Sequence, residues 1–185
     1  MIITISGVPG SGKSTVAGIV AKKLKMKHYS VGGIMRELAA KRGMTILELS
    51  RLAEKDGSID EELDARQKAL GKKDNIVVDS RLGFHFIPGS FKVFLYVSPD
   101  EAGRRIFAAR RNGEQENVTL AGTTLNIRHR KASEQLRYRK LYGVDPHKKA
   151  YYDVCIDTTR MCPEEVADRI IKAAKIKTAK NRKNK

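Results

Sequence analysis

The sequence predicts an α/β fold, with helices on both faces of a five-stranded parallel sheet in a three-layer arrangement. Five short runs of apolar and β-branched residues recur along the chain, and longer stretches with helical patterning separate them. Strands that alternate with helices are typical of βαβ units, whose strands lie parallel in one sheet. The expected strands are Ile2 to Ser6, His28 to Ser30, Ile76 to Asp79, Val93 to Val97 and Val154 to Asp157.

Helix starts are indicated by residues that cap the first turn. A hydroxyl side chain followed three residues later by glutamate satisfies two free backbone N–H groups, and this capping box occurs three times. The pairs are Thr45 with Glu48, Ser58 with Glu61, and Ser98 with Glu101. The polar, arginine-rich stretch from about 110 to 141 cannot supply a sheet strand, so we expect it to be helical and largely outside the core. Within it, residues 113–124 are expected to form a loop.

Length and composition limit the classes of protein to which the chain can belong. With 185 residues, of which 41% are apolar, the chain can bury a core of its own as one globular domain. It has no run of about 18 apolar residues, so a membrane-spanning helix is not expected. Its apolar first residues lead into a glycine loop, which favours a strand over a signal peptide. Cys155 and Cys162 lack the spacing of metal ligands, so we expect free thiols in a cytoplasmic protein.

The net charge of +16 is unusual, and part of it is local. Residues 172–185 hold seven basic side chains and no acidic one. We therefore expect one domain at 1–175, followed at 176–185 by a disordered basic tail that binds polyanions weakly and without specificity. Net charge alone does not distinguish an RNA-binding protein from an enzyme that binds two nucleotides. The positions of the charged residues in the sequence are needed to separate these two classes.

The segment from Gly7 to Ser14 follows an apolar strand and opens a helix. Its sequence, GVPGSGKS, fits G-x-x-x-x-G-K-[ST], the P-loop pattern, in which glycines let backbone N–H groups surround a phosphate. Lys13 would contact the β- and γ-phosphates of ATP, and the Ser14 hydroxyl would ligate Mg²⁺. The expected ATP-binding residues are Gly7, Val8, Pro9, Gly10, Ser11, Gly12, Lys13, Ser14 and Thr15.

A second phosphate-site element lies at the end of the third expected strand. Asp79 ends this apolar run, as in the Walker B pattern, and would orient magnesium through water. Arg81 would lie over the ligand crevice at the carboxyl ends of the parallel strands. The sequence has no base-reading N-K-x-D segment, which argues against a GTPase, and P-loop motors and transporters are larger. Of the P-loop classes considered, this leaves the compact kinases, in which arginines form the acceptor site.

Several segments resemble nucleoside monophosphate kinases, and in particular the archaeal type of cytidylate kinase. The stretch from Ser30 to Arg36 is similar to that family's acceptor-phosphate pattern, S-x-G-x-[FLIM]-x-R. Further similar segments follow in the family's order at 41–50, 59–67, 79–82, 130–138, 142–145 and 156–166. The resemblance covers about residues 1–175 and implies a P-loop NTPase fold with two small added subregions. These are an acceptor-binding region at about 31–72 and a lid at about 110–130.

The same resemblance implies roles for residues outside the P-loop. The acceptor-binding residues that it implies are Ser30, Arg36, Arg66, Arg81 and Glu134. Arg110, in the lid, would contact the phosphates of ATP. The expected catalytic residues, which would neutralise charge during transfer, are Lys13, Arg81, Arg130 and Arg137. By spacing alone, residues 130, 134 and 137 share one helical face, which also fits an exposed ladder of ion pairs.

The implied activity is that of a cytidylate kinase, with direct transfer of the γ-phosphate of MgATP to CMP or dCMP. AMP or UMP remains open as the acceptor, because no residue pattern here distinguishes cytosine from uracil or adenine. A P-loop ATPase that acts with RNA or in ribosome assembly is a more distant alternative, motivated by the net charge and the basic tail.

Overall fold

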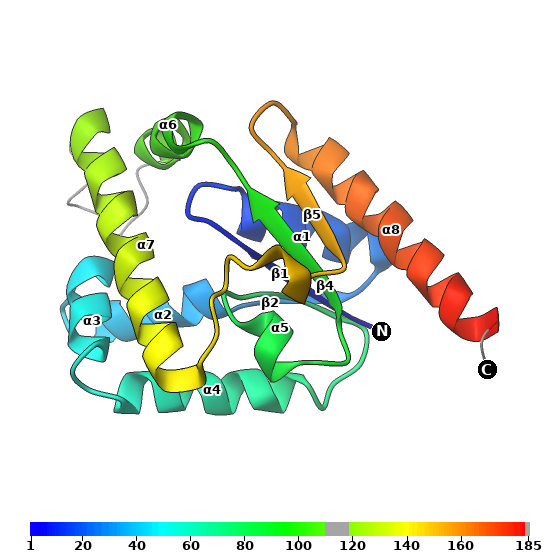
Figure 1. Ribbon diagram of the computed structural model, residues 1–185, viewed down its shortest axis with the longest axis horizontal. Helices are drawn as coiled ribbons and strands as arrows, with labels where there is room; N and C mark the ends of the chain where they lie inside the picture. Colours follow the sequence, from blue (N-terminus) through cyan, green and yellow to red (C-terminus); the bar gives the residue numbers. More distant parts are fainter. Residues whose placement is uncertain (110–118, 184–185) are drawn as a thin grey trace.

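The computed structural model describes residues 1–109 and 119–183. Within these residues, five parallel strands form one sheet in the order β2-β3-β1-β4-β5 (Figure 1). The strands are β1 (Ile2–Gly7), β2 (Lys27–Ser30), β3 (Ile76–Asp79), β4 (Phe91–Tyr96) and β5 (Val154–Asp157). The predicted fold class and the five predicted strands are confirmed, although β4 begins earlier than expected.

Helices α1 (Lys13–Leu24) and α8 (Pro163–Lys183) pack together over one face of the sheet (Figure 1). Alternate strand residues point to this face and meet apolar side chains of the two helices. The main buried side chains of this core are Ile3, Ile5, Val77, Val93, Leu95, Val16, Val20, Val166 and Ile170. Helices cover both faces of a parallel sheet, which explains why β1, β3 and β4 are largely apolar.

A second group of helices follows β2 and covers the other side of the sheet. It consists of α2 (Val31–Lys41), α3 (Ile46–Ala53) and α4 (Ser58–Leu70), and the short α5 (Gly83–Phe86) packs beside them on β1. Their apolar side chains form a separate buried cluster with those residues of β3 that point away from α1 and α8. Its members include Met35, Ile46, Leu49, Ile59, Leu63, Ile76 and Val78. The segment expected to bind the acceptor is therefore a helical layer with its own core.

The three predicted helix caps differ in outcome. At Thr45 the capping box forms: its hydroxyl accepts from the Glu48 N–H at 3.1 Å, and the Glu48 carboxylate accepts from the Thr45 N–H at 2.7 Å. The Ser98 hydroxyl accepts from the N–H three residues later at 3.4 Å. The predicted box at Ser58 is wrong, because Asp56 accepts the Ser58 N–H at 3.0 Å and the helix already begins at Ser58.

Helices α6 (Pro99–Ala109) and α7 (Leu120–Tyr142) pack against each other, and a 3₁₀ helix, η1 (Lys149–Tyr151), precedes β5. The arginine-rich stretch is therefore helical from Leu120 onward, as predicted. The loop expected at 113–124 is wrong for its last residues, because the Thr119 hydroxyl accepts from the Gly122 N–H at 3.0 Å and starts α7 there.

Residues 176–183, which the sequence places in a disordered basic tail, continue α8 in the structure. The buried side of α8 reaches Ala174 and anchors the helix on α1, and the lysines and alanines that follow have high helix propensity. Weak polyanion binding by this segment stays a prediction. In the part of the chain that the structure describes, no helix is long and apolar enough to cross a membrane.

The packing of α8 leads to a matched pair of stability predictions. Ile170 is fully buried, so Ile170→Ala should lower the free energy of unfolding by about 2–5 kcal/mol. Ile176, on the same helix, is 50% exposed, and Ile176→Ala should change it by less than about 0.5 kcal/mol. Urea denaturation followed by circular dichroism measures both values. Equal effects would contradict the packing of α8 on the sheet.

Candidate active site

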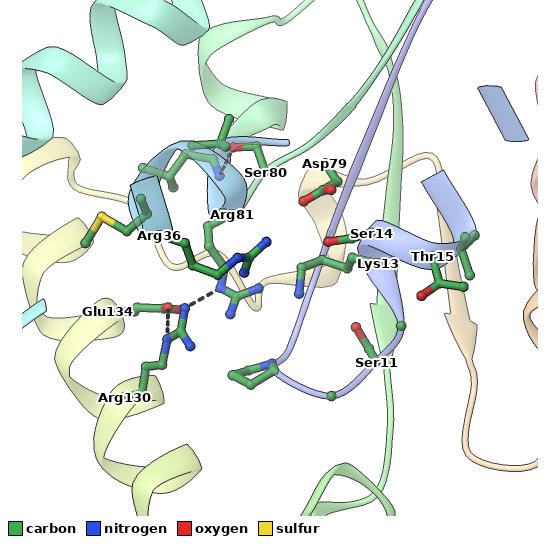
Figure 2. A pocket seen from close by; sticks show the side chains of 18 of the residues that line it. Ser11, Lys13, Ser14, Thr15, Arg36, Asp79, Ser80, Arg81, Arg130 and Glu134 are labelled. Atoms are coloured by element: carbon green, nitrogen blue, oxygen red, sulfur yellow. Dashed lines mark hydrogen bonds and ion pairs between the residues drawn. The ribbon is translucent and has the colours of Figure 1, made fainter. Parts of the chain in front are cut away.

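The P-loop joins β1 to α1. Gly10 and Gly12 adopt left-handed backbone conformations, with φ of 79° and 81°. A side chain at Gly10 would not fit, because an added Cβ would lie 2.7 Å from the Cα of Ala102. Helix α1 starts at Lys13, so the positive end of its dipole faces the loop. The Lys13 ammonium donates to the Val8 carbonyl at 3.1 Å, which folds this side chain back across the loop (Figure 2).

A cavity of about 380 Å³ opens beside the P-loop and extends to α2, α3, α4 and α7. Lys13 and five arginines line it, and three of these arginines, Arg36, Arg81 and Arg130, come from three different segments of the chain. Figure 2 shows Lys13, Arg36 and Arg81 converging on one space. A cavity that joins a phosphate loop to a second group of cations can hold two anionic ligands, one beside the other.

Asp79 lies at the carboxyl end of β3, in register with Ser30 on β2. Its carboxylate is buried and is 3.1 Å from Nε2 of His28. Burial opposes its ionisation, but the hydrogen bond with His28, the charge of Lys13 and the nearby hydroxyls of Ser30 and Ser14 together lower its pKa. Asp79 is therefore an ionised carboxylate next to the Ser14 hydroxyl.

Arg81 connects the P-loop to α7. Its Nη1 donates to the Gly7 carbonyl at 2.8 Å, and its Nε donates to the Glu134 carboxylate at 2.6 Å (Figure 2). The other oxygen of Glu134 lies 3.3 Å from Nε of Arg130. Burial opposes ionisation of Glu134, but the charges of Arg81 and Arg130 outweigh it and lower its pKa to about 2. One buried carboxylate thus holds two arginines at the edge of the cavity.

Arg137 lies further along α7 and makes different contacts. Its Nε is 3.1 Å from Oδ2 of Asp60, in the first turn of α4, and its Nη1 donates to the Ser50 carbonyl at 3.2 Å. Arg137 and Asp60 are both buried, at 6% and 5% exposure. Since Glu134 and Arg137 are buried and line the cavity, this face of α7 is not an exposed ladder of ion pairs.

Comparison with known proteins identifies the family. The model of the Cytidylate kinase-like family matches residues 2–160. The chain belongs to this family. The cytidylate kinase of Archaeoglobus fulgidus is 40% identical over 182 residues, 97% of this chain and 98% of that protein. The cytidylate kinase of Methanobrevibacter smithii is 33% identical over 177 residues, 95% of this chain and 99% of that protein.

Solved structures show how the fold of this cytidylate kinase-like protein relates to other kinases. Shikimate kinase from Bacteroides thetaiotaomicron superposes with a TM-score of 0.67 at 16% identity, over 95% of this chain and 98% of that one. A gluconokinase from Sinorhizobium meliloti gives 0.60 at 14% identity, over 97% and 93%. At these identities the likeness concerns the fold alone, and it confirms the P-loop α/β class.

The structure brings most of the predicted site residues of this family member to the cavity. Those that line it are Pro9, Gly10, Ser11, Gly12, Lys13, Ser14, Thr15, Arg36, Asp79, Arg81, Arg130, Glu134 and Arg137. Gly7 and Val8 support the loop through their carbonyl groups. Ser30 caps α2, where its hydroxyl accepts from the Gly33 N–H at 3.1 Å. Arg110 lies outside the described residues.

Arg66 does not reach the cavity in this structure. Its side chain is 48% exposed and forms an ion pair of 2.7 Å with Glu62, one turn earlier on α4. The side of α4 that lines the cavity carries Asp60, Leu63, Asp64 and Gln67. Helical periodicity separates the two sets, because residues 62 and 66 lie on a different face from 60, 63 and 67. The predicted contact of Arg66 with the acceptor is not made here.

Arg105 and Asp60 are among the cavity residues that were not predicted from the sequence. Arg105 lines the cavity and is held by the turn after β5, where it donates to the Thr158 carbonyl at 2.7 Å. It is one of several arginines in one helix, and only the packing of that helix distinguishes it. Asp60 has the appearance of an ordinary acidic residue in the first turn of a helix. Its burial against Arg137 depends on how α4 and α7 pack.

The low pKa of Glu134 predicts how its contribution to stability depends on pH. A carboxylate whose pKa is lowered on folding stabilises the protein above its unfolded pKa, near 4.5, and loses this effect as the pH falls through about 2. Glu134→Gln should lower the free energy of unfolding at pH 7 by on the order of 3 kcal/mol. The difference from the wild type should shrink steadily below pH 5.

Denaturant unfolding at a series of pH values measures this difference. Glu164→Gln, which removes an exposed carboxylate at the start of α8, is the control for the loss of one negative charge. A difference for Glu134→Gln that stays constant from pH 7 to pH 3 would contradict the ion-paired state of Glu134.

Proposed function

We propose that this chain is a cytidylate kinase, which transfers the γ-phosphate of ATP to CMP or dCMP and gives ADP and CDP or dCDP. The observation that carries the proposal is the cavity itself, in which the P-loop faces Arg36, Arg81 and Arg130. An ATP triphosphate on the loop would meet the phosphate of an acceptor held by the arginines. The relatives are named cytidylate kinases, which favours CMP over AMP or UMP and over an ATPase that acts with RNA.

In the proposed reaction, an oxygen of the acceptor phosphate attacks the γ-phosphorus of ATP in line with the bond to the β,γ-bridging oxygen. The bond from phosphorus to the acceptor oxygen forms, the bond to the bridging oxygen breaks, and that oxygen leaves as part of ADP. No protein nucleophile is required, so the protein acts by holding the two phosphates in line and by neutralising their charge.

The charges of the cavity suit this task. Burial and the nearby charge of Arg81 lower the pKa of Lys13 well below its ordinary value. Phosphate groups on the P-loop would reverse this effect, because they bring negative charge to the ammonium group. Lys13, Arg81 and Arg130 would then surround the transferring group, and Glu134 would keep the two arginines in place. Arg36 would bind the acceptor phosphate from the opposite wall.

We also propose that magnesium enters this site together with ATP. The residues fit such an ion, because the Ser14 hydroxyl and the ionised Asp79 carboxylate are adjacent oxygen donors of the kind that Mg²⁺ prefers. The described residues contain no cluster of three or more His, Cys, Asp or Glu that could bind a metal ion, so phosphate oxygens and water would supply the other ligands. The ion would neutralise charge on the phosphates.

The function is tested by measuring ADP production with MgATP and each of CMP, dCMP, UMP, AMP and GMP, and with no acceptor. We expect turnover with cytidine monophosphates. Lys13→Ala should reduce kcat/KM for CMP by at least about 100-fold, because it removes a charge that stabilises the transferring group. Lys22→Ala, at an exposed position on the same helix, is the control and should leave the rate unchanged. Full activity of Lys13→Ala would contradict the proposal, and so would ADP production at the same rate with every monophosphate and with no acceptor.

A further inference from the structure

A histidine outside the cavity holds the Asp79 carboxylate. Nε2 of His28 lies 3.1 Å from Oδ2 of Asp79, and the histidine side chain is 27% exposed whereas that of Asp79 is buried. Among the described residues, those that line the cavity include Asp79 but not His28. A nucleotide that enters the cavity would therefore leave the contact between the histidine and the carboxylate in place.

The pairing of β2 with β3 explains why the two side chains meet. His28 and Ser30 are two residues apart on β2 and point to the same face of the sheet, and Ser30 is in register with Asp79 on β3. This is the face that α1 covers. A Cβ added at Gly18 of α1 would lie 4.0 Å from Nδ1 of His28, so one ring nitrogen faces α1 and the other faces Asp79.

The hydrogen bond between the two side chains has one possible direction. The pKa of Asp79 is lowered, so its carboxylate is ionised and can only accept. Nε2 of His28 must therefore carry a proton, which it can do both in the neutral ring and in the charged ring. The contact does not require a particular charge on the histidine.

The Asp79 carboxylate has a second cationic neighbour, on the P-loop. The charge of Lys13 acts on it and contributes to its low pKa. A carboxylate that rotated to form an ion pair with Lys13 would be less available to a metal ion, and it would also hold the ammonium away from the phosphates. By holding Oδ2, His28 limits this rotation and keeps the carboxylate beside the Ser14 hydroxyl (Figure 2).

Carboxylates that bind metal ions in proteins are commonly held by a further hydrogen bond, which fixes their orientation. We propose that His28 is a positioning residue for magnesium, whose Nε2–H holds the Asp79 carboxylate beside Ser14 in the orientation that receives the ion. The histidine does not itself contact the ion. This inference rests on the proposed function and adds to its magnesium site a residue from outside the cavity.

Two substitutions of the histidine test this role. His28→Leu keeps an apolar side chain but removes the donor, whereas His28→Gln keeps a donor, because Nε2 of glutamine is as many bonds from Cβ as Nε2 of histidine. Calorimetry measures the affinity of each variant for ATP with Mg²⁺ and with EDTA in its place. We expect His28→Leu to bind MgATP about 10-fold or more weakly than the wild type and to bind metal-free ATP equally well. His28→Gln should bind both forms as the wild type does.

A double-mutant cycle tests whether His28 acts through Asp79. In an Asp79→Asn background, His28→Leu should have no further effect on the affinity for MgATP, because the carboxylate that the histidine positions is absent. An equal loss in both backgrounds would overturn the inference. His129→Leu, at an exposed position on α7, is the control for the loss of a histidine and should change neither affinity.

Circular dichroism and thermal melting show whether the variants are folded, and the wild type provides a measurement that does not depend on them. Two-bond ¹⁵N–¹H NMR spectra of the histidine rings report which ring nitrogen carries the proton. We expect the neutral ring of His28 to carry it on Nε2. A proton on Nδ1 would overturn the inference, because Nε2 could not then donate to Asp79.

The outcomes separate this inference from the proposed function. A folded His28→Leu variant that binds MgATP as tightly as the wild type, or that loses the same affinity for metal-free ATP, would overturn the inference and leave the kinase function intact. Equal losses in His28→Leu and His28→Gln would also overturn it, because the donor would then not matter. A wild type that phosphorylates no nucleoside monophosphate would instead overturn the proposed function.

Discussion

The ion pair between Arg81 and Glu134 is the interaction on which the site depends. Six lysine and arginine side chains line one cavity, and their mutual repulsion would separate them without buried negative charge. Glu134 supplies that charge to Arg81 and Arg130, and Arg81 also binds the carbonyl of Gly7. Through these contacts, one carboxylate on α7 positions the end of β3 and the P-loop relative to each other.

The parallel sheet explains why these groups meet. The carboxyl ends of β1, β2 and β3 are neighbours at one edge of the sheet, and they carry Gly7, Ser30 and Asp79. The P-loop turns into α1 at this edge, while the layer α2–α4 and the long α7 enclose the cavity from the other sides (Figure 1). The phosphate chemistry therefore lies on the rigid sheet, and the acceptor end is built from helices that pack on it.

The sequence predicted those parts of the protein that local patterns determine. The five strands, the P-loop and Asp79 follow from short apolar runs and fixed motif spacing. Side-chain directions on the helices could not be predicted so well. Arg66 points to solvent beside Glu62, and Arg137 pairs with Asp60, because contacts between α4 and α7 decide both orientations. The position of α8 likewise depends on its packing against α1, which a run of basic residues does not indicate.

The central claim is that one cavity holds ATP and a cytidine monophosphate with their phosphates in line. Calorimetry with a bisubstrate ligand, adenosine and cytidine joined through five phosphates, tests it most directly. We expect one ligand per chain, binding at least about 100-fold more tightly than ATP or CMP alone, because both halves are held at once. Binding no tighter than that of ATP, with CMP still able to bind to the complex, would show that the two nucleotides do not share this cavity.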